Sequence, residues 1–212
     1  IRECIQVNQN SRILLSNYAE TLWLLRTLRR LFEKHLGVSV EVSIDIDMTA
    51  VVNDSKTQFW RNTFNECGVT DLCLDLISTG IENSLTLEAI NLLIVLLAER
   101  NGNSDVQKRI YNYLKNKDST FFFIRVKELL GELSLWYQKE AENVQVLESE
   151  NHEAVMVLPD ENSIFTLLQL MCEGEYLPLK GFMREQEDNI QQVCLPSILA
   201  SILDFLSRRE SQ

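Results

Sequence analysis

The sequence predicts an all-α protein, an α-solenoid of stacked, armadillo-like helical hairpins. Long segments of its 212 residues repeat apolar side chains at steps of three and four, the period of an amphipathic helix. Only three prolines and seven glycines interrupt the chain, so these segments contain few helix breakers. The expected helices are joined by links of a few residues, as antiparallel neighbours in helical hairpins are.

The N-terminal part, residues 1–58, is expected to hold one long helix and an acidic excursion. Residues 11–36 form the amphipathic helix, and Gly37 follows as a helix-ending residue. Its polar face carries four cationic side chains, Arg26, Arg29, Arg30 and Lys34. From Val38 to Thr49 the apolar period changes to two, which predicts a short β-strand.

A helical-repeat domain is expected over residues 59–139. The helices predicted in and around it are 56–67, 70–79, 84–100, 103–117 and 121–139. Gly68 and Gly80 end the first two. The third is apolar nearly all round, with Glu88 and Asn91 as interruptions, so we expect it to be the central helix, covered on several sides.

An acidic linker is predicted at residues 140–162, because carboxylates gather there and the helical period is weak. Beyond it, residues 163–212 are expected to begin a second helical domain. Its predicted helices are 163–173, 177–186 and 189–208. The structural core should include seven apolar residues of the two domains, Leu92, Leu93, Ile94, Leu96, Leu168, Leu170 and Cys172.

The net charge of −11 argues against nucleic-acid binding, which needs a basic surface to displace counterions. The longest apolar run, Leu87–Ala98, is shorter than the roughly 20 residues that a bilayer requires, so we expect no membrane span in this chain. The five cysteines are scattered without a CxxC pair: Cys4, Cys67, Cys73, Cys172 and Cys194. They predict reduced, mostly buried thiols of a cytosolic protein.

No pattern predicts catalysis. His35 is expected to interact with helix C-terminal carbonyls, and His152 lies in the acidic linker. Three carboxylates of the excursion offer oxygen ligands for a divalent cation, Glu41, Asp45 and Asp47. A solvated acidic loop explains them better, because no calcium-loop pattern or glycine-rich phosphate loop is present. We therefore predict a non-enzymatic protein without catalytic, cofactor or metal residues.

Two further groups allow a binding hypothesis. The cluster of Arg26, Arg29, Arg30 and Lys34 would match an acidic partner or an inositol phosphate, although a solvated helix face is the simpler interpretation. The run Phe121–Phe123 is more typical of the start of a packed helix than of an exposed docking site.

Two stretches resemble the ryanodine and inositol trisphosphate receptors. Residues 102–117, with the sequence GNSDVQKRIYNYLKNK, are similar to the ryanodine receptor pattern Gly-Asn-x-(Glu/Asp)-Val-Gln, then Tyr-Leu-Lys-x-Lys and Phe-Phe. Residues 68–77, GVTDLCLDLI, resemble the inositol trisphosphate receptor form. Residues 165–174, FTLLQLMCEG, resemble the opening of the domain that both receptor groups carry before their channel region. The chain departs from that pattern at Glu175-Tyr176 and Lys180-Gly181, as a divergent member would.

The resemblance covers about residues 59–205 and implies a calcium-release channel of the endoplasmic or sarcoplasmic reticulum. It implies a homotetramer in which this segment lies on the cytosolic side, contacts neighbouring domains of its own subunit and couples ligand binding to pore opening. Membrane contact and any calcium site would lie outside this chain. The alternative is a soluble armadillo-type adaptor that binds a partner protein in its groove.

Overall fold

The described part of the chain consists of α-helices. The computed structural model describes residues 17–36, 55–99, 102–116, 119–147, 161–186 and 194–200. Its helices are α2 (Tyr18–Leu36), α3 (Ser55–Glu66), α4 (Val69–Thr79), α5 (Asn83–Leu97), α6 (Ser104–Asn116), α7 (Thr120–Leu147), α8 (Glu161–Cys172) and α9 (Leu177–Glu185). Residues 195–200 are also helical. None of these ranges contains a strand, which confirms the all-α class, whereas the predicted strand Val38–Thr49 lies outside them.

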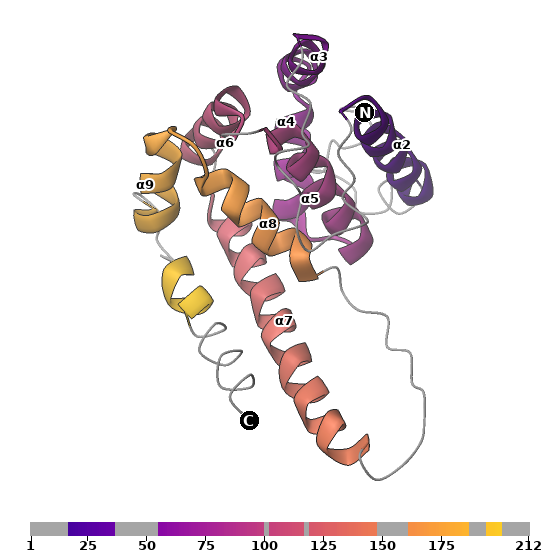
Figure 1. Cartoon of the computed structure of the whole chain (residues 1–212), viewed down its shortest axis with the longest axis vertical. Helices are drawn as coiled ribbons and strands as arrows, with labels where there is room; N and C mark the ends of the chain where they lie inside the picture. The colour runs from indigo at the N-terminus through magenta and orange to yellow at the C-terminus, as the bar shows by residue number, and fades with distance from the viewer. Residues whose placement is uncertain are drawn as a thin grey trace.

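Helix α5 lies at the centre of the fold. It packs against α2 and α4, and also against α6 and α8. Figure 1 shows α5 between α2 on one side and α8 on the other. Every residue from Glu88 to Leu97 is buried, as the helix without a polar face was predicted to be.

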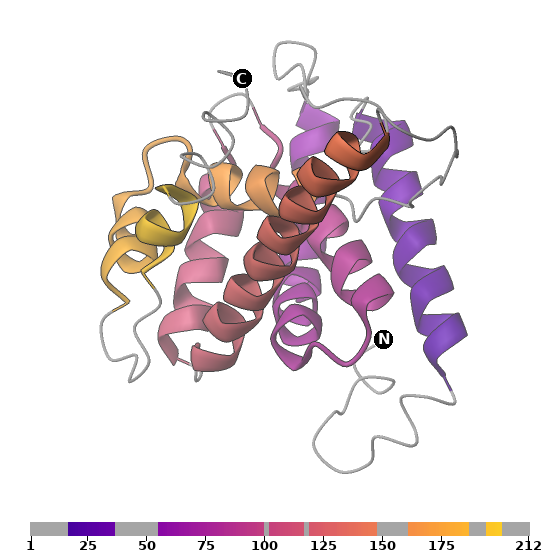
Figure 2. The same ribbon diagram turned by 90° about the horizontal axis from the view of Figure 1, so that it is seen from below.

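The other helices pack around this centre in pairs. Helix α4 contacts α6 and α7, and α9 contacts α6 and α8. The 28-residue α7 is longer than the other helices of the described chain, and its end projects beyond them in Figure 1. Figure 2 shows α7 crossing the face of the bundle, with α2 at one edge. The architecture is therefore one of packed helical hairpins, consistent with the predicted solenoid.

Glycines lie at both ends of α4. Gly80 was predicted to end this helix, and Gly68, predicted to end the preceding helix, lies between α3 and α4. Gly68 precedes the helix with φ 82°, and Gly80 follows it with φ 54°, both in the left-handed region that favours glycine. Space also restricts Gly80, since a Cβ atom there would lie 3.0 Å from Cδ of Arg125. At the start of α6, Oδ1 of Asn103 accepts the backbone N–H groups of Asp105 and Val106, each at 3.1 Å, as an N-cap does.

The structure corrects the start of the predicted acidic linker. Helix α7 ends at Leu147, not near residue 139, so residues 140–147 are helical. Glutamate is a good helix former, and a high density of carboxylates does not by itself end a helix. Residues 148–160 lie outside the described ranges. After them α8 packs against α5, so it shares a core with the helices that precede the linker.

The residues predicted to form the core are buried with one exception. Leu92, Leu93, Ile94 and Leu96 of α5 and Leu168 and Leu170 of α8 belong to one hydrophobic cluster. Cys172 is exposed, contrary to the prediction. It is the last residue of α8 and faces a groove beside α9. The apolar period of a helix gives the face on which a residue lies, but not whether another helix covers that face. Among the described helices, none is long and apolar enough to span a membrane.

Candidate functional site

Two polar side chains interrupt the apolar surface of α5, and each is buried against another helix. Glu88 faces α2 and Asn91 faces α8. A buried polar group is costly unless it is hydrogen-bonded, so such contacts are specific to one arrangement of the helices. The candidate functional site is therefore the set of polar contacts through which α2 and α8 attach to α5.

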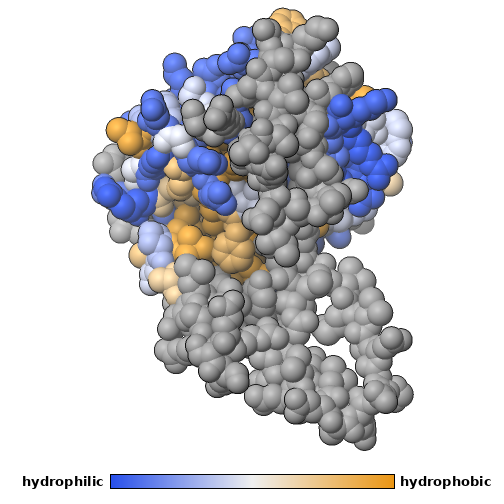
Figure 3. All heavy atoms as spheres, in the orientation of Figure 1, coloured by the Kyte–Doolittle hydropathy of each residue, from blue (hydrophilic) through white to orange (hydrophobic). Residues whose placement is uncertain are grey.

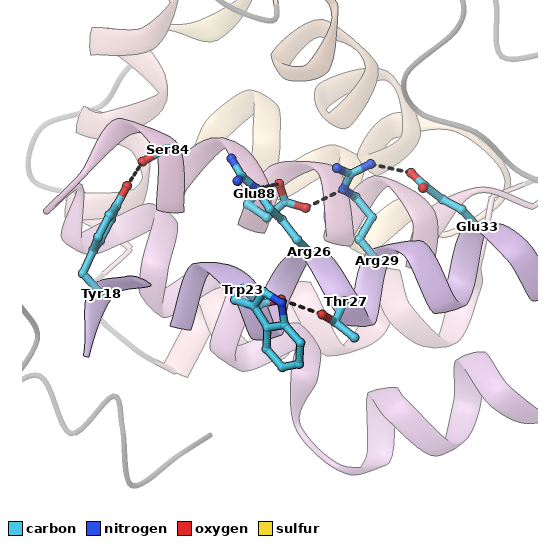
Figure 4. A network of polar contacts seen from close by, with 8 residues as sticks. All are labelled: Tyr18, Trp23, Arg26, Thr27, Arg29, Glu33, Ser84 and Glu88. Carbon is cyan, nitrogen blue, oxygen red and sulfur yellow. Dashed lines mark hydrogen bonds and ion pairs between the residues drawn. The ribbon is translucent and has the colours of Figure 1, made fainter. Parts of the chain in front are cut away.

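The first part of this site is the α2–α5 polar contact, formed by Arg26, Arg29, Glu33 and Glu88 (Figure 4). Arg29 donates from Nε to Oε1 of Glu88, and from Nη1 to Oε1 of Glu33 at 2.7 Å. Nε of Arg26 lies 3.5 Å from the other carboxylate oxygen of Glu88. Burial opposes the charge of Arg29, but its hydrogen bonds with Glu88 and Glu33 outweigh burial and raise its pKa. The guanidinium therefore stays charged, and Glu88 holds it inside the protein.

This contact corrects the interpretation of the cationic cluster as a solvated helix face. Arg29 is buried in an ion pair within the chain, whereas Arg26, Arg30 and Lys34 remain exposed. The partner of Arg29, Glu88, is 59 positions away in the sequence. One sequence feature could have predicted this pair. Glu88 lies within the apolar run of α5, and a buried carboxylate requires a cationic partner.

The second part of the site is the α5–α6–α8 clamp, formed by Asn91, Gln107 and Ser163. Oγ of Ser163, near the start of α8, donates to Oδ1 of Asn91 at 2.6 Å. Nε2 of Gln107 donates to the carbonyl oxygens of Leu170 and Glu173, both at 2.8 Å. The last carbonyls of a helix lack partners inside the helix. Gln107 satisfies that of Leu170, in the last turn of α8, and that of Glu173, directly after the helix. The clamp thus holds α8 at both ends.

Replacing Gln107 with leucine should loosen the C-terminal end of α8. The side chain is buried, so its loss leaves two carbonyl groups without their donor and should cost about 1–3 kcal/mol of stability. Amide hydrogen exchange in α8 should accelerate more than exchange in α4. The control is Asn112→Leu, an exposed position on the same helix. Equal exchange rates in the two variants would contradict the clamp.

Two acidic side chains of α4 attach it to α6. Arg109 donates from Nε and Nη2 to the two carboxylate oxygens of Asp71, at 2.8 and 2.6 Å. This bidentate pairing raises the pKa of Arg109. The hydroxyl of Tyr113 donates to Asp75, and burial together with that hydrogen bond raises the pKa of Tyr113. Helix α6 therefore connects α4 to the clamp on α8.

The candidates for metal binding and acid–base chemistry lie outside the described side chains. These are His35, Glu41, Asp45, Asp47 and His152. Within the described residues, no group of three or more histidine, cysteine, aspartate or glutamate side chains is placed to hold a metal ion.

The four described cysteines are free thiols, but the prediction that most are buried is wrong for them. Cys67, Cys172 and Cys194 are exposed, and Cys73 is buried in α4. All three exposed cysteines lie at helix ends or next to them, where apolar composition does not imply burial. Burial raises the pKa of Cys73 from its ordinary value of 9.0 to about 12, which keeps this thiol protonated and a poor nucleophile.

We expect alkylation of the native protein to modify Cys67 and Cys194 rapidly and to spare Cys73 until the protein unfolds. Cys172 is exposed at the end of α8, but partial burial of its thiol raises its pKa, so it should react more slowly than the other two. Mass spectrometry of the labelled peptides measures this directly. The raised pKa has a second consequence, because the unfolded thiol ionises near pH 9 and the folded one only near pH 12. Cys73 should therefore leave the free energy of unfolding unchanged below about pH 9 and lower it as the pH rises toward 12. Rapid native labelling of Cys73 would contradict the described packing of α4.

The phenylalanine run at the start of α7 packs largely as predicted. Phe122 and Phe123 are fully buried, and their rings meet edge to face at 5.4 Å. Phe121 is exposed. The run therefore anchors α7 in the core through two of its three rings.

An apolar groove of about 500 Å³ lies between α8, α9 and residues 195–200. Phe165 and Leu168 line it from α8, Met183 from α9 and Leu195 from the last described helix. Lys180 and Arg184 also line it, so the groove carries positive charge. Figure 3 shows hydrophobic surface in the area between α8 and α9.

Comparison with known families identifies the part of the chain that contains this groove. Residues 160–211 match the family model described as RyR and IP3R homology associated. The match begins next to α8, includes α9 and contains Ser163 of the clamp. No solved structure matches the chain significantly.

Proposed function

We propose that this chain is part of the ryanodine and inositol trisphosphate receptor superfamily and that it has a coupling function. The match of residues 160–211 to the RyR and IP3R homology associated family supports this proposal. The chain is a scaffold segment of a ligand-gated intracellular calcium-release channel. It transmits the effect of ligand binding toward the pore and performs no chemistry itself.

The observation that carries this proposal is the attachment of the matched domain to the central helix. Helix α8 is held to α5 by Asn91 and to α6 by Gln107, while α5 is held to α2 by Glu88. Packed helices with specific polar contacts move as units between discrete arrangements. A displacement of α2 should therefore be passed to α8 through the contacts that both helices make with α5.

The proposed setting follows from the family. The segment lies on the cytosolic face of the endoplasmic or sarcoplasmic reticulum membrane and contacts neighbouring domains of the same channel subunit. The complete channel is a homotetramer, and its membrane-spanning helices and ion pathway lie outside this chain.

A single-channel recording tests the coupling function. Asn91→Ala in the complete channel removes the α5 side of the Ser163 contact and leaves the hydrophobic core in place. Ligand should then open the channel less, with unitary conductance unchanged, because conductance is set at the selectivity filter. Asn112→Ala, at an exposed position of α6, is the control and should gate normally. Altered conductance with normal gating would contradict the proposal.

The apolar groove beside α9 favours the second candidate, an armadillo-type adaptor that binds a partner protein. The two functions differ in what surrounds this chain, since a channel subunit contains several apolar segments of about 20 residues. A complete protein that lacks such segments and forms no channel in any assay would favour the adaptor.

A further inference from the structure

The outer surface of α2 carries two parallel stripes of side chains. Residues four positions apart share one face of a helix. One stripe consists of Trp23, Thr27 and Leu31, and the other of Arg26, Arg30 and Lys34. Trp23 is 66% exposed, and Figure 4 shows it on the side of α2 away from Glu88. The face opposite the first stripe packs on α5. Arg26 of the second stripe also reaches Glu88, so this surface borders the α2–α5 polar contact, while Arg30 and Lys34 lie outside that contact.

A concave apolar pocket continues the first stripe toward α3. It has a volume of about 130 Å³ and is lined by Leu28, Leu31, Phe32, Trp60 and Phe64. Phe32 and Phe64 are in edge-to-face contact at 4.3 Å, and Trp60 packs 6.1 Å from Phe64 while remaining 47% exposed. A dry cavity of roughly 150 Å³ holds one benzene ring, so this pocket has room for one large apolar side chain.

The charge of this surface differs from that of the whole chain. The protein has a net charge of −11, yet α2 exposes three cations on this side and only Glu20 as an exposed anion. A basic surface on an acidic protein attracts an acidic partner and directs it to one place. A negatively charged bilayer fits less well, because the whole chain repels it and a concave pocket receives a protruding side chain better than a flat surface.

We propose that the surface formed by the two stripes and the pocket, hereafter the α2–α3 surface, binds an acidic amphipathic helix of a partner. One large apolar residue of that helix fills the pocket, and further apolar residues contact Trp23. Its carboxylates lie opposite Arg30 and Lys34. This is recognition of a helix by an apolar groove with flanking charges. The inference deepens the proposed function and rests on it, since it supplies the contact through which the scaffold joins a neighbouring segment.

Selection from a displayed library of helical peptides tests the α2–α3 surface for any partner of this chemistry. The full 212-residue chain is the bait, and the peptides are about 20 residues long, close to the length of α2. We expect the enriched peptides to be acidic, with apolar residues at helical spacing. Trp60→Ala should lower their affinity at least ~10-fold, because tryptophans at the centre of an interface carry much of the binding energy.

A charge reversal makes the test specific. Arg30→Glu/Lys34→Glu should abolish binding of the acidic peptides and enrich basic ones instead. Phe121→Ala and Lys127→Glu change an exposed aromatic residue and an exposed cation of α7, and should leave affinity unchanged. Circular dichroism should give the same melting temperature for the charge reversal and the two controls, since each replaces exposed side chains, and it should show that Trp60→Ala keeps its helical spectrum.

Three outcomes would overturn the inference. One is a set of enriched peptides without acidic bias, and another is binding that Trp60→Ala does not weaken. The third is binding of the chain to phosphatidylserine vesicles that Trp23→Ala abolishes, which would assign the surface to a membrane. If one of these outcomes is found and Asn91→Ala still impairs gating, the docking proposal is wrong and the coupling function stands. If acidic peptides are selected but Asn91→Ala gates normally, the coupling function is wrong and the docking proposal stands.

Discussion

Replacing Leu93 with aspartate should cause a severe loss of stability. Leu93 is fully buried in the middle of α5, with apolar neighbours on both sides along the helix. The substitution either buries a carboxylate without a partner or forces the helix to repack, at a cost on the order of 4 kcal/mol or more. Chemical denaturation followed by circular dichroism measures the loss.

The matched control is Leu135→Asp on α7. Leu135 is 58% exposed, so its replacement by aspartate should change the free energy of unfolding by less than about 1 kcal/mol. Similar stabilities of the two variants would show that α5 is not the centre of the core. In the proposed channel, Leu93→Asp should also abolish ligand-driven opening, because the helix that connects α2 to α8 no longer packs.

Truncating Glu88 to alanine should produce the second large loss of stability. It removes a carboxylate that accepts a hydrogen bond from buried Arg29 and leaves that guanidinium with Glu33 as its remaining ion-pair partner. Breaking a buried ion pair on one side typically costs 3–5 kcal/mol. The expected result is a lower midpoint of urea denaturation and faster hydrogen exchange in α2, which detaches first.

A double variant separates the charge effect from packing. In Arg29→Met/Glu88→Leu neither member of the buried pair is charged, so the protein should be more stable than Glu88→Ala although two residues differ. The exposed pair Arg184–Glu185 gives the control, because Glu185→Ala should cost less than about 1 kcal/mol. A double variant less stable than Glu88→Ala would mean that the pair contributes more through packing than through charge.

Several structural features followed from the sequence because they depend on local patterns. The apolar period of α5 predicted a helix covered on all sides, and Gly68 and Gly80 predicted the ends of α3 and α4. The resemblance of residues 165–174 to the receptor superfamily agrees with the family match over residues 160–211. Each of these signals lies within one short segment, so a single sequence contains it in full.

Features that depend on contacts between distant segments were decided by the tertiary structure alone. Helical periodicity placed Arg29 among polar-face residues, but it could not show that Glu88, 59 positions away, would bury it. It also placed Cys172 in the core, although the residue faces a groove at the end of α8. The pocket between α2 and α3 likewise requires side chains from two separate helices. Periodicity reports how one helix divides between apolar and polar faces, whereas the partner of each face is set by packing of the whole chain.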